Sequence, residues 1–457
     1  MIERGCRLPA VALGWMHELL AKALGDDLLA EVVALARDLI RIDTTNPPGR
    51  ETLCVEVLEA YLARNGVESE RASRDPARAN LIARVRGRGT GPSFAVVGHT
   101  DVVYADPADW SSPPFAGTVR DGHLWGRGAL DMKGQTAASA VALAVLARSG
   151  WVPNGDVLLI AEADEEDGAD QVGMSWLVRE RPDLRCDYAV TEANYRHVLA
   201  DGRTIYTLVV GEKMTMPVRV IVRGVAGHAS VPTLGDNALL RLAPVLDRLA
   251  AYEPELRPSP ELDAMLDVVA PGGGSPAERI ARGRLQHEQL WHLLPAIAGS
   301  TIVPTMASAS RKRNVIPAEA YVEYDCRVLP GTRVDELLGE FRTALHGLEV
   351  ELELVEAPLG GSRSALETPL KDALAEWVDE LEPGALLVPE ISTGFTDAHF
   401  LREAYGTIAY GFFPLRHTAP ELLNTMHAPD ERIDVRDLEL AVRSFVHCID
   451  RIGSVVA

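Results

Sequence analysis

The sequence of 457 residues has few cysteines and no long apolar run. Its five cysteines are an odd number and form no C-x-x-C pair. We therefore expect reduced, mostly buried thiols in a cytoplasmic protein rather than a disulfide framework. No stretch of about 18 uninterrupted apolar residues occurs, which argues against a membrane span. Residues 8–16 are only weakly apolar, and they lack the apolar core and small-residue cleavage site of a secretion signal.

Positive charge is also scarce. The chain holds 66 acidic and 45 basic side chains, which gives a formal net charge of −21. We see no Lys/Arg-rich block, so we do not expect a nucleic-acid partner. No G-x-x-x-x-G-K-[ST] phosphate loop is present, so we do not expect nucleotide binding either. An acidic surface favours solubility and attracts cations, but it does not identify a function.

Apolar runs alternate with helical patterns in the first part of the chain. Residues 28–40 and 52–65 show helical spacing, and further helices are predicted near 135–147 and 173–179. Short apolar runs predict strands at residues 81–85, 94–97, 157–161 and 188–190. This alternation is typical of an α/β sheet with helices on its faces.

The pattern changes at about residue 214. Strands are predicted at 216–222, 300–305 and 320–328, helices at 237–250 and 334–345, and a Pro/Gly-rich stretch at 253–277. Strand–helix–strand–strand–helix–strand is the order of a small α+β layer domain. After residue 358 the first pattern returns and ends in a helix at 436–452. We therefore predict a discontinuous α/β domain, 1–213 and 358–457, with an α+β domain, 214–357, inserted in it.

Acidic and histidine side chains follow three of the predicted strands. His99 and Asp101 follow the strand at 94–97, the acidic run 164–167 follows the strand at 157–161, and Glu192 follows the strand at 188–190. Open α/β sheets bind ligands beyond the carboxyl ends of their strands. Two more candidates are Asp131, just before the helix at 135–147, and His427, in a late loop.

These side chains would have to share one cleft to act together. Two carboxylates about 4 Å apart repel by roughly 4 kcal/mol at an effective dielectric constant near 20. Acids gathered in this way stay ionised only if cations lie among them. Two histidines and three carboxylates suit Zn²⁺, Mn²⁺ or Co²⁺. Five ligands are too many for one tetrahedral zinc, whereas two ions bridged by one carboxylate use the whole set.

Each candidate also has an ordinary interpretation, and spacing alone does not show that the five meet. His427 fits a surface or core histidine, and the acidic run 164–167 fits a solvated loop. Asp131 fits a helix cap, and Asp101 fits a turn residue.

A series of ordered motifs resembles the M20 metallopeptidase family, which contains carboxypeptidases, aminoacylases, dipeptidases, acetylornithine deacetylases and succinyl-diaminopimelate desuccinylases. The resemblance covers about residues 28–450. The motifs are GHTDVV at 98–103, WGRGALDMKG at 125–134, DEE at 164–166, GHAS at 227–230, NVIP at 314–317, DCR at 325–327 with Pro330 and Gly331, and HAPDE at 427–431.

The resemblance implies two metal ions, usually zinc. One ion would be held by His99, Asp131 and Glu192, and the other by Asp131, Glu166 and His427, so that Asp131 bridges them. Asp101 would orient His99, as metal-bound histidines commonly require. Glu165 would be the general base. Many relatives have Gly-Glu-Pro around the residue that matches Glu192, whereas this chain has Thr-Glu-Ala.

The inserted domain resembles the family's lid and dimerisation domain, which implies a homodimer. In relatives the histidine that matches His228 reaches the active site of the partner subunit. Asn314 and Arg327 match residues that contact substrate, and an arginine suits a substrate carboxylate. The alternative for Arg327 is a salt bridge within its strand, to Asp325 or Glu323. The loop with Gly394, Phe395, Thr396 and Asp397 resembles a Gly-Gly-Thr-Asp loop that contacts the substrate, but Phe395 replaces a small residue.

We therefore expect metal-assisted hydrolysis of an amide bond in a small peptide or an N-acyl amino acid. Glu165 would take a proton from the attacking water and return it to the leaving nitrogen, and His228 would help to hold the oxyanion. Residues 129–133 and the long insertion favour the carboxypeptidase and aminoacylase branches over the desuccinylase branch. The alternatives are an N-acyl-amino-acid deacylase, an inactive peptide-binding relative and a two-metal phosphoesterase.

Overall fold

The chain divides into two compact units. A computed structural model describes residues 16–168, 170–192 and 195–456. The first unit contains residues 1–210, 364–389 and 396–457, and the second contains 211–363 and 390–395. The sequence pattern placed residues 390–395 in the first domain, whereas they belong to the second unit. Residues 8–15 of the weakly apolar N-terminal segment lie outside the described residues.

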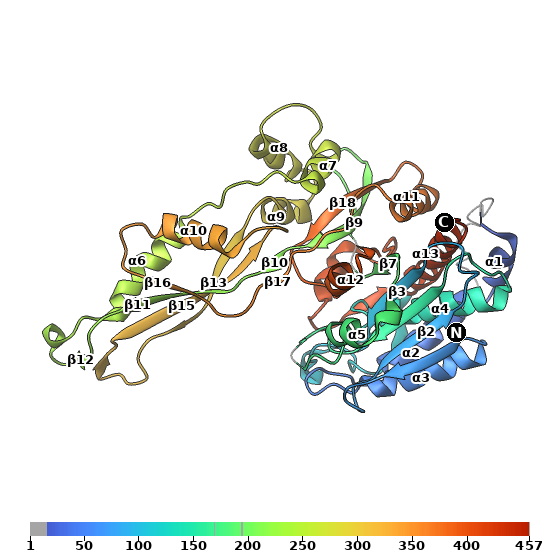
Figure 1. Ribbon diagram of the computed structural model, residues 1–457, viewed down its shortest axis with the longest axis horizontal. Helices are drawn as coiled ribbons and strands as arrows, with labels where there is room; N and C mark the ends of the chain where they lie inside the picture. The colour runs from blue at the N-terminus through green and yellow to red at the C-terminus, as the bar shows by residue number, and fades with distance from the viewer. Residues whose placement is uncertain (1–15, 169, 193–194, 457) are drawn as a thin grey trace. The chain divides into compact units, whose positions relative to one another are not determined.

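A nine-stranded sheet forms the centre of the first unit (Figure 1). Its order is β1 (Glu68–Ala72), β2 (Asn80–Val85), β6 (Val157–Glu162), β3 (Phe94–His99), β7 (Tyr188–Thr191), β19 (Ile408–Gly411), β9 (Thr204–Glu212) and β18 (Leu386–Ser392), and β8 (Arg196–Val198) pairs with β9. β3 runs parallel to β6 and β7, and β19 runs parallel to β7. The carboxyl ends of β3, β6 and β7 therefore lie at one edge of the sheet, as the sequence predicts.

Helices cover this sheet. α4 (Lys133–Ser149) packs against β3 and β6, and α2 (Leu28–Ile40) and α13 (Val435–Gly453) pack against α4. Every residue of α4 from Lys133 to Leu146 is buried, which is why its sequence is rich in alanine and has no polar face. α5 (Met174–Glu180) and α12 (Ala398–Tyr405) belong to a second apolar cluster with β2, β3 and β6. The remaining helices of this unit are α1 (Glu18–Ala23), α3 (Glu51–Arg64) and α11 (Pro369–Leu381).

A small sheet beside the main one has the order β20 (Arg432–Asp434), β5 (His123–Trp125) and β4 (Thr118–Arg120). β5 and β20 are antiparallel, with Trp125 opposite Arg432. The segment that follows β5 and the segment that precedes β20 therefore join the small sheet next to each other.

The second unit is an α+β layer. Its sheet contains β16 (Glu351–Leu354), β11 (Val218–Arg223), β15 (Glu319–Val328), β10 (Met214–Thr215) and β17 (Leu359–Gly360), and β13 (Thr301–Ser308) pairs with β15. β15 alternates between buried and partly exposed residues, and its buried side packs against α6 (Ala238–Ala250) and α10 (Val334–Ala344). The order β11, α6, β13, β15, α10, β16 is the predicted one, and the expected α/β fold with an inserted α+β layer is confirmed.

The stretch after α6 differs from the prediction. It contains α7 (Pro260–Val269), where the sequence indicated only a Pro/Gly-rich segment at 253–277. α8 (Pro276–Gly283) begins at the end of that segment, and α9 (Glu288–Ile297) follows it in a stretch for which no element was predicted. Pro260 and Pro276 stand at the first helical position, preceded by Ser259 and Ser275, whose side chains cap the helices. Proline is favoured there because its missing N–H has no intrahelical partner to lose. These prolines therefore start helices rather than interrupt them.

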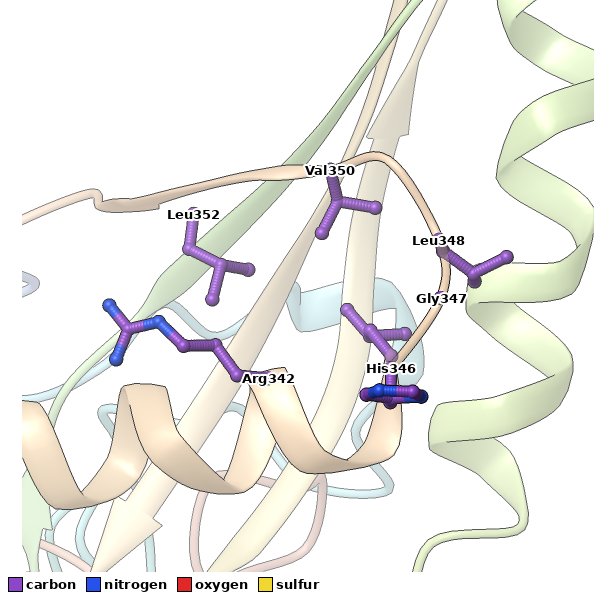
Figure 2. A pocket seen from close by; sticks show the side chains of 7 residues that line it. Arg342, His346, Gly347, Leu348, Val350 and Leu352 are labelled. Carbon is purple, nitrogen blue, oxygen red and sulfur yellow. The ribbon is translucent and has the colours of Figure 1, made fainter.

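Three further features complete the fold. The described cysteines, Cys54, Cys186, Cys326 and Cys448, are buried and unbridged, as expected. None of the described helices has both the length and the apolar character needed to cross a bilayer. In the second unit, a pocket of about 350 Å³ lies between the end of α10 and β16, and Figure 2 shows Arg342 and His346 beside the apolar side chains of Leu348, Val350 and Leu352.

Candidate metal centre and active site

The five predicted metal ligands meet at the edge of the first unit's sheet. His99 is the last residue of β3, Glu166 lies in the loop after β6, and Glu192 follows β7 directly. Asp131 lies two residues before α4, and His427 lies between a short 3₁₀ helix, Pro420–Thr425, and β20. Parallel strands thus supply three of the candidates and loops supply the other two.

The ligand atoms form two groups that share Asp131. In the first group, Nε2 of His99 lies 3.1 Å from Oδ1 of Asp131 and 3.7 Å from Oε2 of Glu192. In the second, Nε2 of His427 lies 3.0 Å from Oδ2 of Asp131 and 3.1 Å from Oε2 of Glu166. Within each group all the ligand atoms lie within 4.8 Å of one another. Each oxygen of Asp131 thus faces one of the two histidines.

Asp101 contacts His99, the residue it is predicted to orient, and it also supports the acidic loop. Nδ1 of His99 lies 3.0 Å from the backbone oxygen of Asp101 and 3.5 Å from its carboxylate. The carboxylate accepts hydrogen bonds from the backbone N–H groups of Glu165, at 3.3 Å, and Glu166, at 3.1 Å. Asp101 therefore links the end of β3 to the acidic loop and holds both glutamates in place.

Asn46 and Arg78 belong to this support, and sequence reasoning missed both. Nδ2 of Asn46 lies 2.9 Å from Asp101 and 3.1 Å from Asp164, so it donates to both carboxylates. Arg78, which is buried, binds Asp164 at 3.2 Å and Glu51 at 2.6 Å. Asn46 precedes Pro47, Pro48 and Gly49, a turn-forming sequence that gives a weak signal. Nothing in the sequence around Arg78 marks it as buried.

Glu162 and Asp397 form a second feature of the site: the resemblance placed Asp397 in a substrate-contacting loop, whereas sequence reasoning missed Glu162. Glu162 ends β6, Asp397 precedes α12, and their buried carboxyl groups share a hydrogen bond. Burial raises the pKa of Asp397 to about 7, and burial together with repulsion from Asp397 raises the pKa of Glu162 well above its ordinary value. Two carboxyl groups in contact share a proton, because both cannot ionise at low cost.

The charges and burial of these side chains favour a bound cation. Without a bound cation, burial raises the pKa of Glu165 well above its ordinary value, and repulsion from Glu192 adds to this. The carboxylates of Asp131 and Glu166 raise the pKa of His427 to about 10. Oε1 of Glu166 is buried and has no hydrogen-bond partner among the described residues. Because each group offers one imidazole and two carboxylates, the residues fit two divalent cations.

We expect cation binding to release protons at pH 7. With a pKa of about 10 in the cation-free protein, His427 is protonated at this pH, whereas a metal ligand must be a neutral imidazole. Affinity should therefore rise with pH through the neutral range. Calorimetric titration of zinc in buffers of different ionisation enthalpy measures the released protons. His427→Gln is the control and should release fewer of them; a binding enthalpy that is independent of the buffer would contradict the prediction.

The predicted substrate residues are distributed differently. His228, Asn314, Arg327, Gly394 and Phe395 belong to the second unit, whereas Thr396 is buried in the first. His228 lies in β12 (Gly227–His228), which pairs with β14 (Val315–Ile316), and the carbonyl of Asn314 accepts a hydrogen bond from Ala229 at 3.0 Å. His228 and Asn314 are therefore neighbours and are both exposed. Arg327 donates to Asp325 at 2.8 Å, which is the salt bridge considered as its alternative.

A basic hollow lies next to His228 and Asn314. It measures about 420 Å³, and its lining includes Arg311, Lys312 and Arg313. Among the described residues no carboxylate lies within ion-pair distance of these three cations, in a chain whose net charge is −21. A run of three basic residues is too short to predict a basic surface from the sequence. The hollow suits an anionic group.

Comparison with known proteins shows what this chain is similar to. The succinyl-diaminopimelate desuccinylase of Rhodospirillum centenum is 31% identical over 422 residues, which cover 89% of this chain and 93% of the relative. The M20 family metallo-carboxypeptidase Sso-CP2 from Sulfolobus solfataricus shares the fold, with a TM-score of 0.68, 17% identity, and coverage of 93% of this chain and 99% of that chain.

A second solved structure shares the fold as well. The YXEP protein of Bacillus subtilis, described as a dinuclear metal-binding peptidase of the M20 family, has a TM-score of 0.61 at 14% identity and covers 93% of this chain and 99% of that chain. A model of peptidase family M20/M25/M40 matches residues 95–451. Because this match includes most of the chain, the protein belongs to peptidase family M20/M25/M40.

Proposed function

We propose that this amide-bond hydrolase holds two divalent ions, in the simplest case Zn²⁺, in the two ligand groups that share Asp131, and that Glu165 is its general base. Co²⁺ and Mn²⁺ suit the same ligands. The observation that carries the proposal is the convergence of five ligands from distant parts of the chain, with Glu165 beside them but in neither group. Oε2 of Glu165 lies 3.9 Å from Nε2 of His99.

The side chains then divide the chemistry among them. When bound, the metal ions would lower the pKa of the attacking water and polarise the substrate carbonyl. Glu165 takes the proton of the attacking water and gives it to the leaving nitrogen. Glu165 lies beside the ligand groups without belonging to either, which suits a group that accepts a proton and then donates it. Asp101 holds the backbone of Glu165 and so aims its carboxylate.

Two substrate classes follow from this chemistry. The first is a small peptide, cleaved as a carboxypeptidase would cleave it. The second is an N-acyl amino acid, and two observations favour it: several relatives about 30% identical to this chain are named succinyl-diaminopimelate desuccinylase, and the basic hollow beside His228 and Asn314 suits a substrate carboxylate.

An activity screen tests the proposed function. The protein is loaded with Zn²⁺, Co²⁺ or Mn²⁺ and offered dipeptides, N-acetyl amino acids and N-succinyl amino acids, with a chelator-treated sample as the control. We expect metal-dependent release of an amine from at least one of these classes. A protein that binds two ions and cleaves no amide would contradict the proposal and favour an inactive peptide-binding relative. Turnover of phosphate esters alone would favour the phosphoesterase.

We also propose that the second unit forms a homodimer. β13 is paired with β15 on one side, and its residues Val303 to Ser308 are exposed. α6 adds the exposed side chains of Leu239, Leu240 and Leu246. Exposed strands and apolar helix faces are open to pairing with another chain. Light scattering measures the mass of the particle directly.

A mixing experiment tests whether His228 acts across the dimer. Glu165→Ala and His228→Ala subunits are each expected to be inactive. After subunit exchange, about a quarter of the wild-type activity should return, because each hybrid dimer would contain one complete site. Exchange is followed with differently tagged subunits. If tagged hybrids form and no activity returns, each site is complete within one subunit.

A further inference from the structure

Two segments that carry proposed metal ligands join the small sheet side by side, one after β5 and one before β20. The chain leaving β5 forms the loop 126–131, which ends at Asp131, and the segment 427–431, which begins with His427, leads into β20. β5 and β20 are paired where these segments begin and end. Asp131 and His427 are 296 positions apart in the sequence, yet their side chains lie 3.0 Å apart. The distance between Asp131 and His427 therefore depends on contacts that hold the two segments together.

Glu431 ties one loop to the other. Its side chain is fully buried, and within the described part of the chain every hydrogen bond that its carboxylate accepts comes from the loop 126–131. Oε2 accepts from Nη1 of Arg127 at 2.6 Å and from the N–H of Gly128 at 3.1 Å. Oε1 accepts from the N–H of Leu130 at 2.7 Å and from the N–H of Asp131 at 3.1 Å. A residue of the His427 segment thus holds the backbone of Asp131 itself.

Arg127, from the loop 126–131, also contacts the backbone of the segment 427–431. Its Nη2 donates to the carbonyl of Ala428 at 3.2 Å, so one guanidinium contacts both ends of the segment 427–431. The ring of Trp110 lies 5.3 Å from this guanidinium. His427 has a φ of 59° and Asp430 a φ of 61°, a left-handed conformation that is uncommon for residues other than glycine. Such a backbone persists only where its surroundings hold it.

We propose that Arg127 and Glu431 form a positioning clamp for the metal centre. The clamp sets the distance between Asp131 and His427, and with it the affinity of the Asp131–Glu166–His427 group for its cation. This inference rests on the proposed function, which places a cation in that group. A buried ion pair alone is no evidence of added stability, because removing its charges from water offsets their attraction. The role assigned here follows from where the hydrogen bonds go.

Metal titration of full-length variants tests the clamp. Glu431→Gln keeps the shape of the side chain but lacks one acceptor oxygen. Arg127→Lys keeps the charge but cannot reach both Glu431 and the carbonyl of Ala428. In each variant we expect one of the two zinc ions to bind about 10- to 100-fold more weakly, which is the usual effect of losing a group that supports a ligand. Competition with a chromophoric chelator measures both dissociation constants, and circular dichroism measures Tm.

Glu382→Gln is the matched control. Glu382 pairs with Arg196 at 2.6 Å, the same distance as in the clamp, and neither residue contacts a metal ligand in the described structure. This variant should bind both ions as the wild type does. The clamp variants should also recover activity at saturating zinc, which a protein lacking Glu165 should not.

The possible results distinguish a failure of the clamp from a failure of the proposed function. If Arg127→Lys binds both ions as tightly as the wild type does, the proposed clamp is wrong. If Glu431→Gln does not fold, the result for Arg127→Lys alone tests the clamp. An equal loss of affinity in Glu382→Gln would overturn it too, because the effect would then be a general loss of stability. If the wild type itself binds no ions, the proposed function fails, and that result is visible before any variant is compared.

Discussion

Replacing Glu165 by alanine is expected to lower kcat by at least about 100-fold and to leave both metal ions bound. The carboxylate of Glu165 lies beside His99 but belongs to neither ligand group, so its loss removes a proton acceptor and no ligand. The measurement pairs turnover of the best substrate from the screen with metal analysis of the dialysed protein. Both values are needed, because lost metal would give the same loss of activity for a different reason.

The neighbouring residue supplies the control for this experiment. Glu166 contacts His427 at 3.1 Å within the second ligand group. Glu166→Ala should therefore lower both activity and the affinity for one ion, whereas Glu165→Ala should lower activity only. A fully active Glu165→Ala protein would remove the proposed mechanism.

Replacing Asp131 by alanine is expected to weaken the binding of both ions, each by more than about 100-fold, the upper end of the effect of losing only a supporting contact. Its two oxygens lie 3.1 Å from His99 and 3.0 Å from His427, one in each ligand group. No other described residue belongs to both groups. The two dissociation constants are measured as for the clamp.

Loss of a single ion would contradict a shared role for Asp131. The comparison with Glu192→Ala sharpens the test, because Glu192 belongs to the first group alone. That variant should keep the cation of the Asp131–Glu166–His427 group. The pair of variants thus distinguishes a bridging carboxylate from an ordinary ligand.

The sequence predicted the first unit well because its strands are short apolar runs that end in chemically distinctive residues. His99, Glu166 and Glu192 each follow such a run, and the rule that parallel strands share a functional edge brings them together. Asp131 and His427 lie in loops, and their places in the site came from the resemblance rather than from any periodicity.

The residues that support the metal ligands could not be predicted from the sequence, for a physical reason. Asn46, Arg78 and Glu431 act through hydrogen bonds to partners far away in the chain, and no local pattern records such contacts. Glu162 reads only as the end of an apolar strand, and its pairing with Asp397 depends on the fold. The helices α7 and α8 were missed because proline was taken as a breaker, although each stands at a first helical position.

Because the metal centre is assembled from distant segments, cation binding would also affect the stability of the folded protein. His99, Asp131, Glu192 and His427 come from distant parts of the chain, which β3, β7 and the β5–β20 pairing bring together in the folded protein. An unfolded chain therefore offers the ions no comparable site. Cations at about 100 times their dissociation constant would then stabilise the native state by about 2.7 kcal/mol for each independent site. The concentration of the bound cation would in this way affect the stability of the protein as well as its activity.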